Sequence, residues 1–211
     1  MNILKFHKDT YSRVTTIVPY ILYLVLGYLS LNFCFFFDTI QLSSLHAHYF
    51  YENGISLLLP THLDSGHPPL NGILLSILWK IFGKELWVGH VWMFLWVLLL
   101  IWQTQSLSRI FFEKKTAPFI AMVLLSDATI LGQSVLVSPD VILMAAFVWV
   151  LVSILKEKPF QTIFAICILS LISTRGMMIT ATLFLFQLFY HFRLQYTIKK
   201  ILIRTLSFAP G

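Results

Sequence analysis

Long runs of apolar residues, separated by short polar turns, fill most of the chain. A transmembrane helix needs about 20 mainly apolar residues, and six runs approach that length: about 15–37, 86–103, 117–137, 141–155, 160–173 and 176–192. The two shortest runs need flanking residues to complete a span. The pattern predicts an all-α polytopic membrane protein with about six transmembrane helices in a single domain, 1–211.

One further apolar run, 70–82, does not fit as a span. It has about 13 residues, follows Pro68-Pro69 and contains Lys80, so it is too short to cross a bilayer. We expect it to form an amphipathic helix on the membrane surface, within a first extracytoplasmic loop that covers 38–85. The same loop is expected to hold a helix at about 42–52 and a turn at Asn53-Gly54.

Composition agrees with a membrane protein. Of the 211 residues, 58% are hydrophobic and 11% charged, whereas soluble domains carry about 25% charged residues. This excludes a soluble enzyme and a disordered chain. The formal charge of +6 would suggest nucleic acid as the partner of a soluble protein, but here it is explained by basic loops beside a membrane, and no nucleic-acid partner is expected. Cys34 and Cys167 lie in apolar runs and indicate no disulfide framework.

Basic residues alternate along the chain as a six-span topology requires. Twelve of the fifteen fall on one side of the predicted membrane: Lys5, Lys8, Arg13, Arg109, Lys114, Lys115, Lys156, Lys158, Arg193, Lys199, Lys200 and Arg204. Lysine and arginine concentrate in cytoplasmic loops, so both termini are predicted to be cytoplasmic in a multi-pass protein of the plasma (inner) membrane. The first loop on the opposite side carries acids and histidines: Asp38, His46, His48, Glu52, His62, Asp64 and His67.

Two sites in that loop are candidates for chemistry. Asp38 follows three phenylalanines at the end of the first span, where a carboxylate could act as a base or simply end the helix in water. The stretch from Asp64 to Leu70 combines an acid and His67 with a glycine and two prolines that fix the backbone. Asp64 and His67 could hold a divalent metal ion, because carboxylate and imidazole are common ligands. The alternative is that the histidines of this loop are ordinary surface residues.

Three charged residues lie further along the chain. Asp140, in Ser138-Pro139-Asp140, is placed at the outer end of the fourth span, where it could pair with an acid of the first loop or cap its own helix. Arg175 lies in the outer turn between the last two spans, and its guanidinium suits either a phosphate or the membrane interface. Asp127 falls within the third span, so it either faces the bundle interior or marks a misplaced span, and no role is assigned to it.

Several of these features together resemble one family. An acid after the first span, Gly-His-Pro-Pro-Leu, Leu-Trp-Lys-Ile-Phe-Gly (78–83), Ser-Pro-Asp and Thr-Arg-Gly occur in this order. The combination is similar to the N-terminal half of the GT-C superfamily of membrane glycosyltransferases, near the bacterial protein O-mannosyltransferases and the aminoarabinose transferase of lipid A. Family members often carry paired acids where Asp38 is followed by Thr39, and the aminoarabinose branch often has lysine where this chain has His67.

The resemblance implies transfer of a sugar from a polyprenyl-phosphate-linked donor to a lipid, polysaccharide or protein acceptor at the extracytoplasmic face. It implies that Asp38 and Asp140 are catalytic, that Asp64, His67 and Arg175 bind the substrate, with Arg175 at the donor phosphate, and that Asp64 and His67 could hold a divalent metal ion. A C-terminal half or partner subunit is a further expected partner. Two other interpretations stay open: a non-catalytic membrane subunit that binds a polyprenyl lipid or a partner protein, and a small transporter.

Overall fold

Every regular element that the structure describes is helical. The computed structural model describes residues 3–36, 39–56, 58–63, 66–197 and 204–208. In chain order the elements are α1 (Ile3–Ser30), a π-helical turn η1 (Ile40–Ser44), α3 (Leu45–Asn53), α4 (Leu70–Phe82), α5 (Leu86–Phe111), α6 (Ala117–Leu125), α7 (Ala128–Ser134), α8 (Pro139–Leu155), α9 (Pro159–Ile172), α10 (Thr174–Arg193) and a short 3₁₀ turn η2 (Leu206–Phe208).

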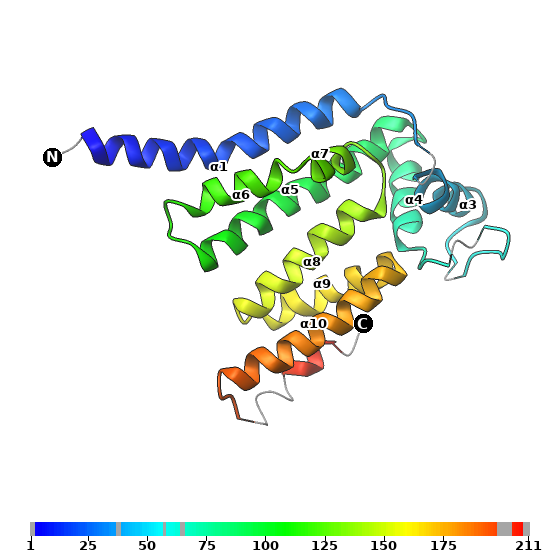
Figure 1. The fold of residues 1–211 in the computed structure, drawn as a ribbon. Helices are drawn as coiled ribbons and strands as arrows, with labels where there is room; N and C mark the ends of the chain where they lie inside the picture. The colour runs from blue at the N-terminus through cyan, green and yellow to red at the C-terminus, as the bar shows by residue number, and fades with distance from the viewer. Residues whose placement is uncertain (1–2, 37–38, 57, 64–65, 198–203, 209–211) are drawn as a thin grey trace.

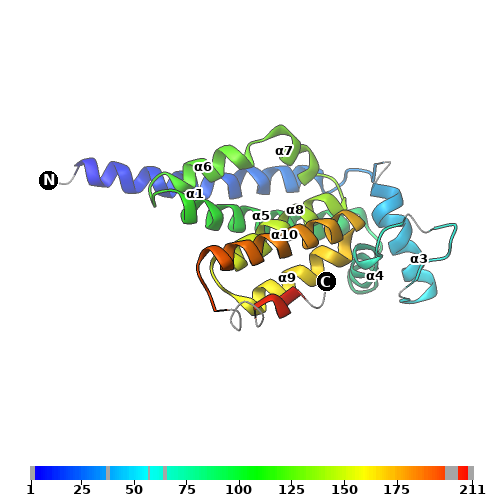
Figure 2. The same cartoon turned by 60° about the horizontal axis from the view of Figure 1, so that its bottom comes forward.

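The long helices pack in layers. Figure 2 shows α5 and α8 between α1 and α6 on one side and α9 and α10 on the other, and α8 packs extensively against both α5 and α9. One buried apolar cluster joins α1, α4, α5 and α8 through residues such as Leu75, Ile101 and Ile142. A second joins α8, α9 and α10 through residues such as Val150, Ile166 and Leu183. α8 contributes to both, so it holds the two parts of the bundle together.

The two ends of the bundle differ in charge. Figure 1 shows that the N-terminus of α1, the α5–α6 turn, the α8–α9 turn and the end of α10 lie at one end. These turns carry Lys114, Lys115, Lys156 and Lys158. At the other end lie α3, α4 and the first turns of α5, α8 and α10. The basic turns are therefore grouped in space in the way that their alternation along the sequence predicts.

The elements of the first loop follow the sequence pattern. α4 begins after Pro69 and ends before Gly83, as predicted for 70–82. The predicted helix at about 42–52 is confirmed as η1 leading into α3, and Gly54 adopts a positive φ of 86° at the predicted turn. α4 buries one face, with Asn71, Leu75 and Trp79, against α3 and α5.

Only part of the predicted span count is confirmed. The segment Arg13–Ser30 and α5 are long and apolar enough to cross a membrane, and α6 with α7 would make a third span if the bent pair is counted as one. α8 and α9 have 17 and 14 residues, which gives lengths below the ~30 Å of a bilayer core at ~1.5 Å per residue. α10 has 20 residues, but it is not among the helices apolar enough to cross a membrane, since it contains Arg175, Gln187, His191 and Arg193.

The third predicted span is broken. α6 ends at Leu125, and α7 starts after Asp127 at an angle of 67°. The Asp127 carboxylate accepts hydrogen bonds from the backbone N–H groups of Thr129, at 2.9 Å, and Ile130, at 3.4 Å. Asp127 is exposed, so it does not face the bundle interior, and its carboxylate caps α7 at the break in the predicted span.

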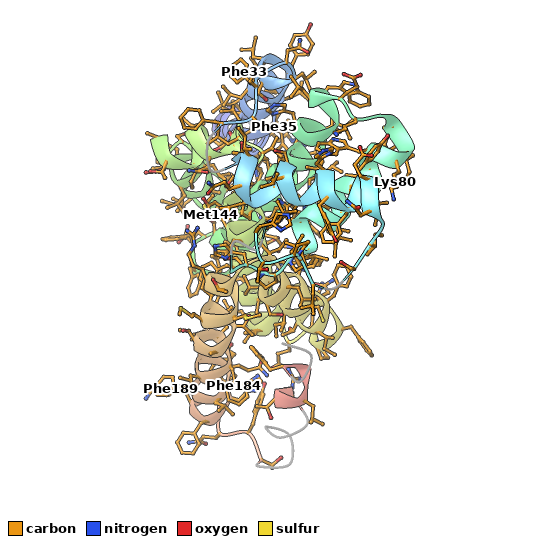
Figure 3. The ribbon with its side chains drawn as sticks, turned by 90° about the vertical axis from the view of Figure 1, so that its right-hand side faces the viewer. Phe33, Phe35, Lys80, Met144, Phe184 and Phe189 are labelled. Atoms are coloured by element: carbon orange, nitrogen blue, oxygen red, sulfur yellow. The ribbon has the colours of Figure 1, made fainter. Side chains whose placement is uncertain are left out.

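At the basic end of the bundle, the C-terminal segment folds back onto α9 and α10. Arg204 pairs with Glu157 at 2.7 Å, and its carbonyl oxygen accepts a hydrogen bond from Gln187 at 2.9 Å. Phe208 is buried edge-on against Phe184, with ring centroids 5.5 Å apart. Figure 3 shows Phe184 on the side of α10 that faces η2 and Phe189 on the other side.

Candidate functional site

The candidate site lies where the loop before α4 meets the first turn of α10. Gly66, at a positive φ of 72°, precedes His67, and Pro68 and Pro69 lead directly into α4. Prolines fix the backbone and suit the start of a helix. His67 is therefore held between a turn that favours glycine and a rigid helix start.

The first turn of α10 is fixed by a cap and a close packing contact. Ser173 is the N-cap, and its Oγ accepts a hydrogen bond from the Arg175 N–H at 3.1 Å. Gly176 lies so close to the end of α9 that a Cβ at this position would come within 1.8 Å of the Leu169 carbonyl oxygen. The absence of a side chain at Gly176 therefore allows α10 to start directly against α9.

This packing brings His67 against Thr174. The His67 Nδ1 lies 3.1 Å from Thr174 Oγ1, 3.5 Å from the Thr174 backbone nitrogen and 3.5 Å from Ser173 Oγ. The two segments are more than a hundred residues apart in sequence, so the contact depends on the tertiary fold.

Arg175 continues the site toward α8. Its Nη1 lies 3.3 Å from Asp140 Oδ1, and the two side chains are 59% and 33% exposed. Ser138 caps α8: its Oγ accepts from the Asp140 N–H at 3.2 Å and donates to Asp140 Oδ2 at 3.3 Å. Three of the predicted site residues thus contact the start of α10: His67 contacts Ser173 and Thr174, and Asp140 pairs with Arg175.

A cavity of about 490 Å³ is lined by His67 and Thr174, whereas Asp140 and Arg175 are not part of its lining. Its lining is mostly apolar, with His67 and Thr174 as its polar side chains. The lining residues are Leu58, Leu59, Gly66, His67, Pro68, Pro69, Leu70, Ile73, Leu171, Thr174 and Met177. A second groove, of about 760 Å³, begins at the same Met177 and continues along α10 to Phe208.

Two predicted site residues lie outside the described part of the chain. Asp38, predicted as a catalytic acid, and Asp64, predicted as a substrate or metal ligand, are among the residues whose placement the structure does not give. Their roles stay predictions.

The described residues do not by themselves form the predicted metal site. Within the described ranges, no three His, Cys, Asp or Glu side chains gather closely enough to hold a metal ion. The Nδ1 of His67 faces α10, so a metal could reach this ring only through Nε2. A site formed by His67 with Asp64 stays a prediction.

The other histidines of the loop have local roles. His46 is buried and its Nε2 lies 3.1 Å from the Leu63 carbonyl oxygen, so the expectation of a surface residue is wrong for this histidine. The exposed His48 lies 2.6 Å from Lys84 Nζ and 3.7 Å from Glu52. His62 is exposed, as expected of a surface histidine.

Ser173 and Thr174 contact His67 but were not predicted as site residues. Both belong to the Ser-Thr-Arg-Gly stretch that contains the predicted site residue Arg175. Their position beside this residue could have indicated that they belong to the site. Their contact with His67 could not be predicted from a single sequence, because it depends on how α9 and α10 pack.

Comparison with known proteins adds no relative: no protein-family model, no curated protein and no solved structure matches this chain.

Proposed function

We propose that this chain is a membrane glycosyltransferase of the GT-C type, or a module of one, that transfers a sugar from a polyprenyl-phosphate-linked donor at the extracytoplasmic face of the plasma membrane. The observation that carries the proposal is that the first turn of α10 carries the Arg175–Asp140 ion pair directly next to Thr174, which with His67 lines an apolar cavity. A lipid-linked phosphate needs such a combination, because its head group is anionic and its tail is a hydrocarbon.

The grooves along α10 suit the two parts of that donor. The cavity at His67 and the groove that reaches Phe208 share Met177 in their linings, so the two lie next to each other along α10. Arg175 is mostly exposed, and its guanidinium can hydrogen-bond two phosphate oxygens. The donor phosphate would lie at the first turn of α10 and the start of the tail in the cavity.

In the proposed reaction, an acceptor hydroxyl oxygen bonds to the anomeric carbon of the sugar as the bond from that carbon to the phosphate oxygen breaks. The leaving polyprenyl phosphate takes the electron pair, and its charge is stabilised by Arg175. A base accepts the hydroxyl proton, and Asp38 is proposed for that role from the resemblance. Asp140 is already paired with Arg175, so we assign it the orientation of that guanidinium.

The proposed orientation follows from charge. The basic turns lie at the opposite end of the bundle from α3, α4 and the candidate site, and such turns are retained in the cytoplasm. On this proposal the chain makes six crossings, with the short helices α8 and α9 completed by flanking residues, and α4 lies at the outer membrane surface.

The second candidate is a transporter, which would share the break between α6 and α7. At that break Asp127 is exposed and its carboxylate caps α7. A transport site would instead hold such a charge inside the bundle, so the geometry favours surface chemistry.

Transfer from labelled donors tests the proposal. Membranes from cells that express the chain would be incubated with undecaprenyl phosphate linked to mannose, glucose or aminoarabinose, and the released undecaprenyl phosphate measured. We expect release from at least one donor, lowered about tenfold or more in Arg175→Gln, because a charge-assisted hydrogen bond contributes about 1.5–3 kcal/mol. Arg193→Gln, at the other end of the same helix, is the control and should act like wild type. No release from any donor, or equal release by both variants, would contradict the proposal.

A further inference from the structure

The hydrogen bonds of His67 define which of its ring nitrogens carries the proton. Thr174 is the first residue of α10, so its backbone N–H has no partner within the helix. That N–H lies 3.5 Å from the His67 Nδ1 and can only donate. Nδ1 must therefore present its lone pair to α10, and in a neutral imidazole the proton then lies on Nε2.

The two hydroxyl groups agree with this arrangement. Ser173 Oγ already accepts from the Arg175 N–H, which leaves its own proton free to donate to Nδ1 at 3.5 Å. Thr174 Oγ1, at 3.1 Å, is the nearest of the three groups, and a threonine hydroxyl can turn its proton toward an acceptor. Each of the three groups that face Nδ1 can thus act as a donor to its single lone pair, and the Thr174 hydroxyl is the nearest.

The opposite edge of the ring is directed away from this contact. His67 lines the apolar cavity together with Pro68, Pro69 and Leu70. Within the described part of the chain, its Nε2 forms no hydrogen bond. An N–H group in the wall of an otherwise apolar cavity is a specific donor for an oxygen atom of a bound ligand.

We propose that Thr174 is a positioning residue that holds His67 as its Nε2–H tautomer, so that His67 donates a hydrogen bond to an oxygen of the ligand in the cavity. The identity of that oxygen, a phosphate oxygen of the lipid-linked donor, rests on the proposed function. The tautomer itself rests on the contacts of Nδ1 alone.

This assignment separates His67 from two other roles. A metal ion at Nε2 would need that nitrogen unprotonated, which would move the proton to Nδ1 and set it against the Thr174 N–H. A general base at Nε2 would need the same lone pair. His67 is instead a hydrogen-bond donor of fixed direction.

Nuclear magnetic resonance of ¹⁵N-histidine-labelled protein in lipid nanodiscs tests the tautomer directly. The chemical shifts distinguish a protonated from an unprotonated ring nitrogen, and the His67→Gln variant identifies the His67 signals by their loss. We expect wild type and Thr174→Ser to show Nε2–H with a free Nδ1. Thr174→Val keeps the shape and the backbone N–H but removes the nearest donor, the hydroxyl at 3.1 Å. Only the two longer contacts, at 3.5 Å, then hold the ring, so we expect a mixture of the two tautomers.

Binding of undecaprenyl phosphate to the protein in the same nanodiscs tests whether the Nε2–H of His67 donates a hydrogen bond to the ligand. Glutamine places its amide nitrogen near the position of Nε2 and asparagine near that of Nδ1. We expect His67→Gln to bind within about threefold of wild type and His67→Asn about tenfold more weakly, as loss of one hydrogen bond to a charged group predicts.

The outcomes of the two experiments are separable. A proton on Nδ1 of wild-type His67, or a tautomer unchanged in Thr174→Val, overturns the inference even if sugar transfer is observed. The Nε2–H tautomer in wild type and its partial loss in Thr174→Val support the positioning role of Thr174. If the protein then binds no undecaprenyl phosphate, the proposed function fails and the tautomer assignment stands.

Discussion

The ion pair between Asp140 and Arg175 joins the first turns of α8 and α10, and its exposure decides what it contributes. With side chains 33% and 59% exposed, the pair is screened by water and contributes little to folding, about 0–1 kcal/mol. Its larger effect is on direction, since the carboxylate holds one end of a long and otherwise mobile guanidinium.

Asp140→Asn should therefore separate binding from stability. We expect its free energy of unfolding to stay within about 1 kcal/mol of wild type, while undecaprenyl phosphate binds about threefold to tenfold more weakly because Arg175 is less well oriented. Thermal unfolding in detergent and lipid binding in nanodiscs measure the two effects. A large loss of stability with unchanged binding would show that the pair is structural.

For individual residues, the sequence indicated which charged side chains belong to the candidate site but not which residues they contact. His67, Asp140 and Arg175 stand in short stretches with proline or glycine, Gly-His-Pro-Pro, Ser-Pro-Asp and Thr-Arg-Gly, and such residues mark fixed backbone positions. Thr174 has no such mark, because its importance comes from a partner in another segment.

Among the elements, the junction of α9 and α10 places the site. The two helices are separated only by Ser173, and Gly176 allows their close approach. A side chain at residue 176 would force the first turn of α10 away from α9 and away from His67.

Gly176→Ala should consequently destabilise the protein by about 2 kcal/mol or more, the size of overpacking in a well-packed interior. Gly132→Ala is the matched control, because Gly132 lies in the helix α7 and a Cβ there meets nothing within 4 Å. Removing a helical glycine should leave stability unchanged or raise it by about 0.5–1 kcal/mol. Thermal unfolding followed by circular dichroism compares them, and equal stability of the two variants would disprove the role of Gly176.

Helix boundaries were predictable where proline or glycine marked them. α4 starts after two prolines and ends just before Gly83, and both boundaries could be predicted from the sequence. The break between α6 and α7 was not, because Ser126 and Asp127 stand inside an otherwise apolar run. There the hydrogen bonds of the Asp127 carboxylate to two backbone N–H groups replace those of a continuous helix.

Over the whole molecule, the separation of basic turns from the site end predicts how the chain lies in a membrane. With Cys34 and Cys167 replaced by alanine, Glu52→Cys in α3 and Glu113→Cys in the α5–α6 turn are matched probes, since both glutamates are exposed. We expect a membrane-impermeant maleimide to label residue 52 in intact spheroplasts and residue 113 only after permeabilisation. Labelling of residue 113 alone in intact spheroplasts would invert the proposed orientation.

The count of crossings could not be read from hydropathy alone. α8 and α9 are apolar, yet α8 starts at a Ser138 cap and Pro139, α9 starts at Pro159, and the two helices have only 17 and 14 residues. Such boundaries depend on local hydrogen bonds and on packing between helices, which an average over apolar residues does not capture.

On the proposed function, the starts of α8 and α10 bind a lipid-linked phosphate. Binding of undecaprenyl phosphate compared with that of undecaprenol, which lacks the phosphate, tests this binding. Wild type and Arg193→Gln should bind the phosphate lipid about tenfold or more tightly than Arg175→Gln does, and all three should bind undecaprenol equally weakly. Equal affinity of all three proteins for both lipids would contradict the account.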